Sequence, residues 1–271
     1  MNFESLYFII DEILRVSNQK QNVQVQMNDS EIIFAYLISF NYFSGNYFKT
    51  LYFLKQTGVL SNVLSKSRFS RRLNRLKDVL SEVLSFLYDI FKDASNKEFC
   101  IDSYPVPICK FIRMKRCKLI DGKEFIGFNA AKEEHFFGFK VNLVVSRKGG
   151  VTEFNILPAS YHDLTGLKAL TLDLPKNSKL FADKAYNDYL QEELLKDVEI
   201  ELLPIRKINS KKSDNKAYVN YYRQKKRKMV ETAISQIQGL FPKTIHATNI
   251  DGFILKIVGF ILCYPSCYLK K

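Results

Sequence analysis

The sequence predicts a mixed α/β domain that follows an all-helical N-terminal region. The first 98 residues carry apolar side chains at helical spacing, whereas from Glu98 onward short apolar runs alternate with turn residues as strands do. The expected segments of the second part follow in the order β-β-β-α-β-α-β, and helices complete the chain. We therefore expect a helical region at residues 1–98 and an α/β domain at residues 99–271.

Two features organise the N-terminal region. Asn28 is followed three residues later by Glu31, a pattern typical of a capped helix start, and Gly45 interrupts the apolar run that follows. A longer amphipathic helix is expected from Arg71 to Lys92. Its front end is basic, with Lys66, Arg68, Arg71, Arg72, Arg75 and Lys77. These cations are either a solvated helix end or phosphate contacts in a DNA-binding module.

The second part begins with the strand FCIDSYPVPIC at residues 99–109. The alternating segment HFFGFKVNLVVSRKGG at residues 135–150 ends at Lys148–Gly150, and the segment 151–160 returns as its hairpin partner. A short helix near Leu167–Leu172 precedes a fourth strand at 179–183, and a helix at 187–197 precedes a fifth strand at 198–205. Residues 252–269 are expected to form a buried helix, because Lys256 and Pro265 interrupt an apolar stretch that is short for a membrane span.

Several classes of protein are excluded by composition. The start MNFESLYFIIDEILR places Glu4, Asp11 and Glu12 where a secretory signal needs a basic start and an apolar core. Five cysteines without a CxxC pair or a Cys/His cluster predict reduced thiols rather than a disulfide framework or a zinc site. We therefore expect a cytoplasmic protein with no membrane partner.

The chain is strongly basic, with 41 Lys and Arg against 28 Asp and Glu, a net charge of +13 and a pI near 9.4. This excess favours a polyanionic partner, nucleic acid first and an anionic membrane surface second. The densest stretch is Arg206–Lys228, expected as a loop, in which Tyr218, Tyr221 and Tyr222 are interleaved. Its cations are Arg206, Lys207, Lys211, Lys212, Lys216, Arg223, Lys225, Lys226, Arg227 and Lys228. The stretch either follows a nucleic-acid backbone or is a solvated loop without a partner.

Three acidic residues in different settings are the candidate site. Asp102 and Asp183 each close a short apolar run, and Glu231 lies near the start of an amphipathic helix directly after the basic stretch. A carboxylate at the end of a buried strand is costly unless a cation or donors meet it. Mg²⁺ takes oxygen ligands octahedrally, and two such ions can hold the attacking and leaving oxygens of a phosphoryl transfer. Arg227, one turn before Glu231, either pairs with it or reaches a phosphate.

The order of Asp102, Asp183 and Glu231 resembles that of the DDE transposases of bacterial insertion sequences, whose catalytic core is ribonuclease H-like. Three strings carry the resemblance: LPASYHDL with His162 and Asp163, ADKAYND around Asp183, and VETAISQIQ around Glu231. The most similar group has a Tyr-Arg-Glu-Lys signature on the glutamate helix. Arg227 and Glu231 match that signature, whereas Gln224 and Gln238 stand at its tyrosine and lysine positions.

The resemblance implies a ribonuclease H-like mixed sheet flanked by helices, and a transposase that cuts the ends of its element and joins them to target DNA. Asp102 would bridge two Mg²⁺ ions, for which Mn²⁺ could substitute, while Asp183 and Glu231 would each hold one. His162 and Asp163 would support the site. The partners would be double-stranded DNA and a second copy of the chain when ends are paired, in the cytoplasm of a bacterium on its nucleoid. The implied DNA contacts are Arg227, Gln224, Gln238, Arg68, Arg71, Arg72, Lys225, Lys226 and Lys228.

Two other readings of the acidic trio remain open. One is a metal-dependent nuclease that cleaves DNA without joining it. The other is a DNA-binding protein whose trio is vestigial, such as a catalytically decayed transposase copy. Strand-transfer products separate the first reading from transposition, and metal-dependent cutting separates the second.

Overall fold

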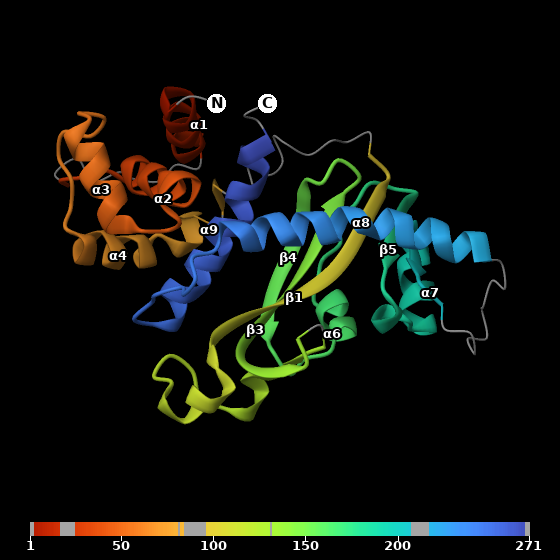
Figure 1. The fold of residues 1–271 in the computed structure, drawn as a ribbon. Helices are drawn as coiled ribbons and strands as arrows, with labels where there is room; N and C mark the ends of the chain where they lie inside the picture. The colour runs from red at the N-terminus through yellow and green to blue at the C-terminus, as the bar shows by residue number, and fades with distance from the viewer. Residues whose placement is uncertain are drawn as a thin grey trace. The chain divides into compact units, whose positions relative to one another are not determined.

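The computed structural model describes residues 3–16, 25–80, 82–83, 96–130, 132–206 and 217–268 (Figure 1). The chain divides into two compact units. One contains Met1–Phe91 together with Gly239–Lys271, and the other contains Lys92–Gln238. Since each unit has its own core, each is described by itself.

The first unit is helical in its described residues. It contains α1 (Phe3–Val16), α2 (Asp29–Phe43), α3 (Tyr47–Gln56), α4 (Lys66–Arg75) and α9 (Ile250–Tyr268). The predicted start of α2 is confirmed, because the Asn28 side chain accepts from the Glu31 N–H and the Glu31 carboxylate accepts from the Asn28 N–H. The helix ends at Ser44, whose left-handed backbone precedes Gly45. The predicted interruption at Gly45 is therefore present.

The C-terminal helix α9 packs into the core of this helical unit. Phe260 is fully buried and lies edge-on to Phe40 of α2, with ring centroids 4.8 Å apart, and the Tyr36 hydroxyl donates to the Leu255 carbonyl. The predicted burial of this segment is thus present, although the segment joins the helices of residues 1–91 rather than the α/β unit. Across the described residues, no helix has the length and apolarity that crossing a membrane requires.

The helix expected at Arg71–Lys92 starts earlier, at Lys66, because the Ser65 side chain caps it by accepting from the Arg68 N–H. A turn at Leu76 separates α4 from the helical residues 77–80. The remainder of the predicted helix lies mostly outside the described residues.

The second unit is built on a six-stranded sheet with the order β2-β3-β1-β5-β6, to which β4 adds by pairing with β3. Its strands are β1 (Glu98–Lys110), β2 (Ile126–Asn129), β3 (Glu134–Ser146), β4 (Val151–Pro158), β5 (Ser178–Ala182) and β6 (Ile200–Pro204). The pairs β1–β3, β2–β3 and β3–β4 are antiparallel, whereas β1–β5 and β5–β6 are parallel. The predicted fold class, a mixed sheet flanked by helices with a helical N-terminal region, is confirmed.

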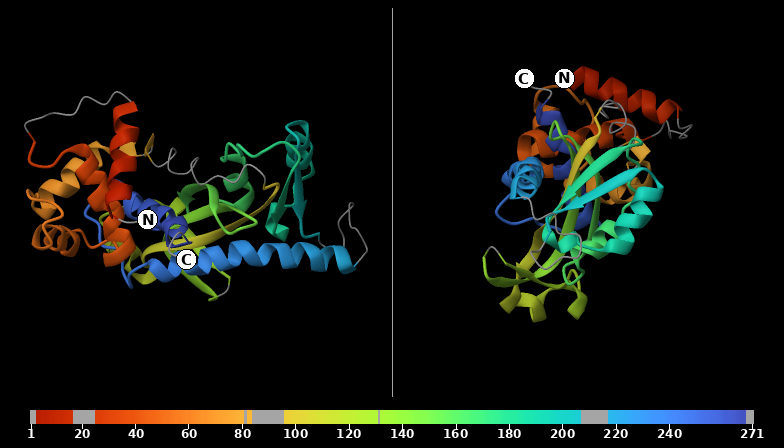
Figure 2. Two further views of the ribbon diagram at one scale, coloured as in Figure 1. Left: turned by 90° about the horizontal axis from the view of Figure 1, so that it is seen from above. Right: turned by 90° about the vertical axis from the view of Figure 1, so that its right-hand side faces the viewer.

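Helices cover both faces of this sheet (Figure 2). On one face, α6 (Asp163–Lys168) and α7 (Tyr189–Asp197) contribute Leu167 and Leu195 to a core with Phe99 and Ile101 of β1. On the other face lies α8 (Ala217–Leu240), whose Tyr222 ring packs edge-on to Phe181 of β5 at 5.8 Å. Beyond the predicted elements, the chain after β1 forms two short 3-10 helices, η1 (Phe111–Arg116) and η2 (Lys123–Phe125), and the short strand β2.

Candidate active site

Alternate residues of β1 face α8 and define the floor of the site. The Glu98 carboxylate accepts from Lys226 Nζ at 2.6 Å, the Cys100 thiol donates to the Lys226 carbonyl, and Asp102 meets Arg227. Because successive side chains of a strand point to opposite faces, these three residues share one face. Strand periodicity therefore directs Asp102 toward α8.

The strand register brings Asp102 beside Asp183. The parallel ladder of β1 and β5 pairs Phe99 with Leu180 and Cys100 with Phe181. Two residues further along each strand, the same register places Asp102 level with Asp183 at the carboxyl end of the ladder. Asp102 closes only the apolar run Phe99–Ile101, because β1 continues to Lys110 through antiparallel pairing with β3, one residue beyond the predicted strand end. What ends near Asp102 is the parallel pairing.

Helix α8 supplies the remaining charged groups. It begins at Ala217, so residues 217–228 are helical and the predicted loop is wrong for this part of the basic stretch. The cause is a buried face on the helix that includes Arg223, Val230, Ala233 and Ile237 and extends its apolar periodicity backward. Glu231 consequently lies in the middle of α8 rather than near its start. Lys207, Lys211, Lys212 and Lys216 lie outside the described residues.

The Arg227 guanidinium lies among all three predicted carboxylates. Its Nη2 atom is 2.8 Å from Asp102 Oδ2 and 3.7 Å from Glu231 Oε1, and its Nη1 atom is 3.2 Å from Asp183 Oδ1. The Arg227 side chain is only 13% exposed, whereas those of Asp102, Asp183 and Glu231 are 21%, 41% and 55% exposed. The trio therefore converges on one internal cation that is more shielded from water than any of its partners.

Burial and charge act against each other at this cluster. Burial raises the pKa of the Asp102 carboxyl, while Arg227 and the Ser103 N–H oppose that rise and leave the pKa above its ordinary value. Burial would lower the pKa of Arg227, but Asp102 and Asp183 raise it above its usual range. The guanidinium thus stays charged and compensates a carboxylate that water solvates poorly.

The donor set fits a hard divalent cation. One carboxylate within β1, one directly after β5 and one on the facing helix supply oxygen ligands, which are the ligands Mg²⁺ prefers. Among the described residues, no group of three or more His, Cys, Asp or Glu side chains is arranged so that it could hold a metal ion. The position of Arg227 accounts for this, because its guanidinium fills the space between the carboxylates. Ion binding at the trio would require Arg227 to move.

Asp163 and His162 are the two predicted supporting residues. Asp163 forms side-chain hydrogen bonds with Ser103 and Lys140 on the face of the sheet opposite Asp102. Its Oδ1 atom accepts from the Ser103 hydroxyl at 2.6 Å and from Lys140 Nζ at 3.1 Å. Ser103 follows Asp102 on β1 and donates its own N–H to Asp102 Oδ1 at 2.8 Å. His162 is the N-cap residue of α6, but its side chain is exposed and makes no capping hydrogen bond.

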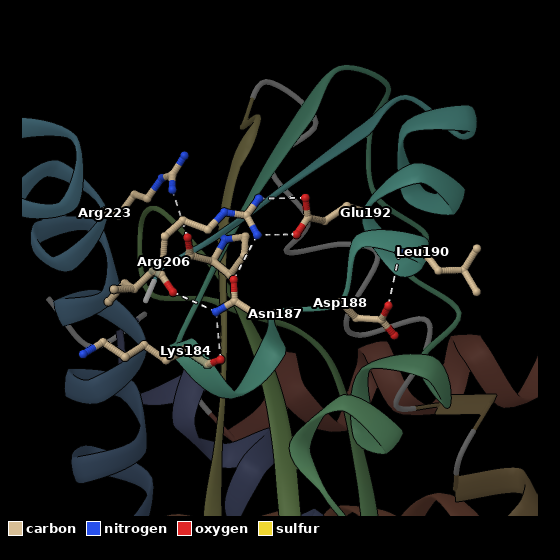
Figure 3. Close-up of polar contacts among 9 residues, drawn as sticks. Lys184, Asn187, Asp188, Leu190, Glu192, Arg206 and Arg223 are labelled. Carbon is tan, nitrogen blue, oxygen red and sulfur yellow. Dashed lines mark hydrogen bonds and ion pairs between the residues drawn. The ribbon is translucent and has the colours of Figure 1, made fainter. Parts of the chain in front are cut away.

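Arg206 binds side chains of its own unit, and Figure 3 shows its guanidinium directed at Glu192 and Asn187. It is 8% exposed, and its guanidinium forms two hydrogen bonds to Glu192, at 2.6 and 2.7 Å, and one to Asn187 at 2.9 Å. Asn187 in turn donates to the carbonyls of Lys184 and Ile205. This network ties the chain that follows Asp183 to the end of β6. The expectation that Arg206 belongs to a solvated basic stretch is wrong.

The predicted DNA contacts fall into two groups. Gln224, Lys228 and Gln238 are exposed and lie on the same stripe of α8 as Glu231, because positions seven apart nearly superimpose on a helix. Lys225 is also exposed, as are Arg68 and Arg71 on α4 of the helical unit. The other group is engaged within the protein, since Lys226 binds Glu98 and Arg72 binds Asp29 at 2.8 Å.

Sequence reasoning missed the residues that hold the charged cluster in place. Glu98 anchors α8 through Lys226 and Tyr222, and Ser103 and Lys140 hold Asp163 on the other face of the sheet. Strand alternation from Asp102 could have identified Glu98 as a neighbour on the same face. The position of Lys140 near Asp163 depends on the pairing of β3 with β1. The alternation of residues within one strand does not predict that pairing.

Comparisons with known proteins indicate the family and the fold of the chain. A sequence model described as a transposase DDE domain matches residues 93–247. The fold is similar to that of the piggyBac transposase, seen by cryo-electron microscopy in a synaptic complex with hairpin DNA, with a TM-score of 0.53. That likeness covers 97% of this chain and 71% of the other at 7% sequence identity, so it concerns the fold alone. No curated protein matches the chain.

Proposed function

The chain belongs to the family of transposases with a DDE domain, and on that premise we propose that it cleaves and joins DNA at Asp102, Asp183 and Glu231. The proposed reaction is a phosphoryl transfer with Mg²⁺, or Mn²⁺ in its place, at the ends of a bacterial insertion sequence. The proposed substrate is double-stranded DNA, with two copies of the chain acting when two ends are paired.

The convergence of the three carboxylates on Arg227 carries this proposal. Carboxylates that lie 2.8, 3.2 and 3.7 Å from one guanidinium must share a small volume. Two of them stand on neighbouring parallel strands, and the third stands on a helix that packs over those strands. Divalent ions held there would lower the pKa of an attacking water and stabilise charge on the phosphoryl oxygens.

The residues of the chain would divide the remaining work. Asp102, the most buried of the three carboxylates, would be the ligand with the most fixed position, because the Ser103 N–H donates to it and β1 pairs with β3 on both sides of it along the chain. Glu231 would complete the ligand set from α8. Arg227 would leave the carboxylates as ions bind, and its side chain could then meet a backbone phosphate, because guanidinium groups recognise phosphates well.

Gln224, Lys228 and Gln238 would line the path of the DNA beside Glu231. Lysine at position 238 would contribute a charge, whereas Gln238 contributes only hydrogen bonds to a phosphate. We therefore expect Lys228 and Lys225 to provide most of the electrostatic attraction along this stripe of α8.

The decisive experiment measures cleavage and strand transfer of duplex DNA that carries the ends of the element, with Mg²⁺ or Mn²⁺. Asp102→Asn, Asp183→Asn and Glu231→Gln should each lose activity by about 10²-fold or more, because charge stabilisation in the transition state is lost. Asp197→Asn, which removes an exposed carboxylate from the end of α7, should retain full activity.

Three outcomes would change the assignment. If the three variants cut as well as the parent, the site is wrong. Cutting without strand transfer would identify a nuclease instead. Duplex binding without any metal-dependent cutting would identify a DNA-binding protein with a vestigial trio.

A further inference from the structure

A short basic segment after β1 has features that the fold does not require. Residues 110–118 have the sequence KFIRMKRCK, with five cations and no acid, and η1 forms their central part. None of the residues of η1 is buried, and the five cations are exposed: Lys110, Arg113, Lys115, Arg116 and Lys118. Since the segment contributes no side chain to a core, packing does not explain its composition.

The charges of this segment are also uncompensated. Within the described part of the chain, none of its five cations forms an ion pair with a carboxylate. By contrast, Lys140, Lys226 and Arg227 of the same unit each pair with an Asp or Glu. Five like charges within nine residues repel one another, so a partner that neutralises them would be bound favourably.

Apolar side chains lie among these cations on the surface. Ile112 is 88% exposed, and Phe111 and Phe128 are 41% and 56% exposed. The His135 ring lies between the two phenylalanines, 5.6 Å from Phe111 and 5.1 Å from Phe128. A partner that offers both negative charge and apolar edges fits this composition. Duplex DNA offers phosphates together with sugar and base edges.

We propose that residues 110–118, with Phe128 and His135, form a second duplex-binding surface at the far end of β1 from the carboxylates. The inference rests on the proposed function, and it adds a contact surface that the catalytic trio and α8 do not include. Arg113, Lys115 and Arg116 bind phosphates, and Ile112 packs against the sugars and base edges of a groove.

The geometry of β1 sets the distance between this surface and the reaction centre. Asp102 and Lys110 are eight residues apart on one strand that has an irregularity between Pro107 and Cys109, so they are at most about 26 Å apart at about 3.3 Å per residue. DNA rises about 3.4 Å per base pair, so the surface meets the duplex within roughly eight base pairs of the phosphate at the carboxylates.

The test measures binding to a duplex of about 30 base pairs between about 50 and 200 mM salt. Arg113→Gln/Arg116→Gln removes two charges from the segment. The matched control, Lys179→Gln/Lys196→Gln, removes two charges from exposed positions on β5 and α7. Each phosphate contact contributes about 0.9 to the salt slope, so the segment variant should have a slope smaller by about 1.8. Across this salt range the parent would then lose about 12-fold more affinity than the segment variant.

A second variant tests the apolar part of the surface. Ile112→Ala should weaken duplex binding without a change in the salt slope, because an apolar contact releases no counterions. On DNA that the protein cleaves, ethylation of phosphates up to about eight base pairs from the cut should interfere with binding by the parent, and less with binding by the segment variant.

The proposal is overturned if the segment variant keeps the parental slope, or if the control loses as much slope as the segment variant. It is also overturned if the segment variant loses binding to vesicles of anionic lipid while duplex binding is unchanged. A parent that neither binds nor cleaves DNA refutes the proposed function instead. A parent that does both, alongside an unaffected segment variant, refutes only the second surface.

Discussion

Replacing Arg227 with glutamine should destabilise the metal-free protein and strengthen its binding of divalent ions. The substitution removes the positive charge on which Asp102, Asp183 and Glu231 converge. The carboxylate of Asp102 would then have no cation against it, beside two other acids. In the parent, by contrast, an ion at the proposed site would have to displace Arg227 before it reached all three carboxylates.

The magnitude follows from the contacts. Two unit charges about 4 Å apart attract by about 1 kcal/mol in water and about 4 kcal/mol at the effective dielectric constant of a protein surface. The side chains of Asp183 and Glu231 are 41% and 55% exposed, so solvent screens their contacts with Arg227, and these contacts contribute little to the free energy of unfolding. The hydrogen bond to Asp102 is charge-assisted and contributes about 1.5–3 kcal/mol. We expect a net loss of about 2–3 kcal/mol on this basis.

The same free energy opposes ion binding in the parent. In the glutamine variant an ion no longer has to displace Arg227, so its affinity for the carboxylates should rise. A difference of about 2–3 kcal/mol corresponds to a gain of about 30- to 150-fold. Calorimetric titration with Mn²⁺ measures this gain, and thermal unfolding with and without Mg²⁺ measures the stability change. Lys228→Gln, which removes an exposed charge from the same helix, should change stability by less than about 0.5 kcal/mol. A glutamine variant that is as stable as the parent and binds Mn²⁺ no more tightly would refute the reasoning.

Three further predictions concern the packing within the two units, two in the α/β unit and one in the helical unit. Burial would raise the pKa of Glu98, but Lys226 and Tyr222 outweigh it and lower that pKa. Glu98→Gln should therefore lower the free energy of unfolding by about 1 kcal/mol at neutral pH. This difference from the parent should disappear as the pH falls through the depressed pKa of Glu98 in the folded protein. Chemical unfolding at a series of pH values from neutral to acid measures it. Glu192→Gln should cost about 3 kcal/mol in unfolding experiments, because it removes the negative charge that lies against the buried Arg206 guanidinium. Gly259→Ala should cost about 1–3 kcal/mol in thermal unfolding, because the added methyl group meets a packed aromatic ring.

Each of these changes has a counterpart that should be mild. Glu193→Gln alters the exposed neighbour of Glu192, and Gly239→Ala adds a methyl group where nothing lies within 4 Å. Comparable losses in Glu193→Gln and Glu192→Gln, or in Gly239→Ala and Gly259→Ala, would argue against the packing and pairing described. If Glu98→Gln remains less stable than the parent at acid pH, the negative charge of Glu98 is not the cause of the stability difference.

The succession of strands and helices along the α/β unit, apart from β2, and the capped start of α2 could be predicted because both depend on local pattern. Alternation identifies a strand, and Asn28 with Glu31 identifies a capped helix. The extent of β1 was predicted to within one residue at each end, 99–109 against Glu98–Lys110, although Asp102 and two prolines interrupt its apolar pattern. Pairing with β3 maintains the strand through these residues, and that pairing is a tertiary effect.

The carboxylates were identified from the sequence by their setting and by a family resemblance, but their relation to Arg227 was not. The four-residue spacing of Arg227 and Glu231 predicts only that these two side chains are neighbours on one face of a helix. The contacts of Arg227 with Asp102 and Asp183 arise when α8 packs over β1 and β5. Similarly, α8 was expected to begin later because a run of cations resembles a solvated loop, whereas Lys226 and Arg223 each find an internal partner.

The central place of β1 implies that the three carboxylates differ in how readily they can be released. β1 is hydrogen-bonded to β3 along its length, with Asp102 opposite Leu143, and to β5 over Glu98–Cys100, so freeing Asp102 requires opening the central strand of the sheet. Glu231 depends only on the docking of one helix. Amide hydrogen exchange should therefore be slowest along β1 and faster in α8, as expected for segments of unequal local stability. Partial undocking of α8 would dismantle the ligand set while the sheet stays folded.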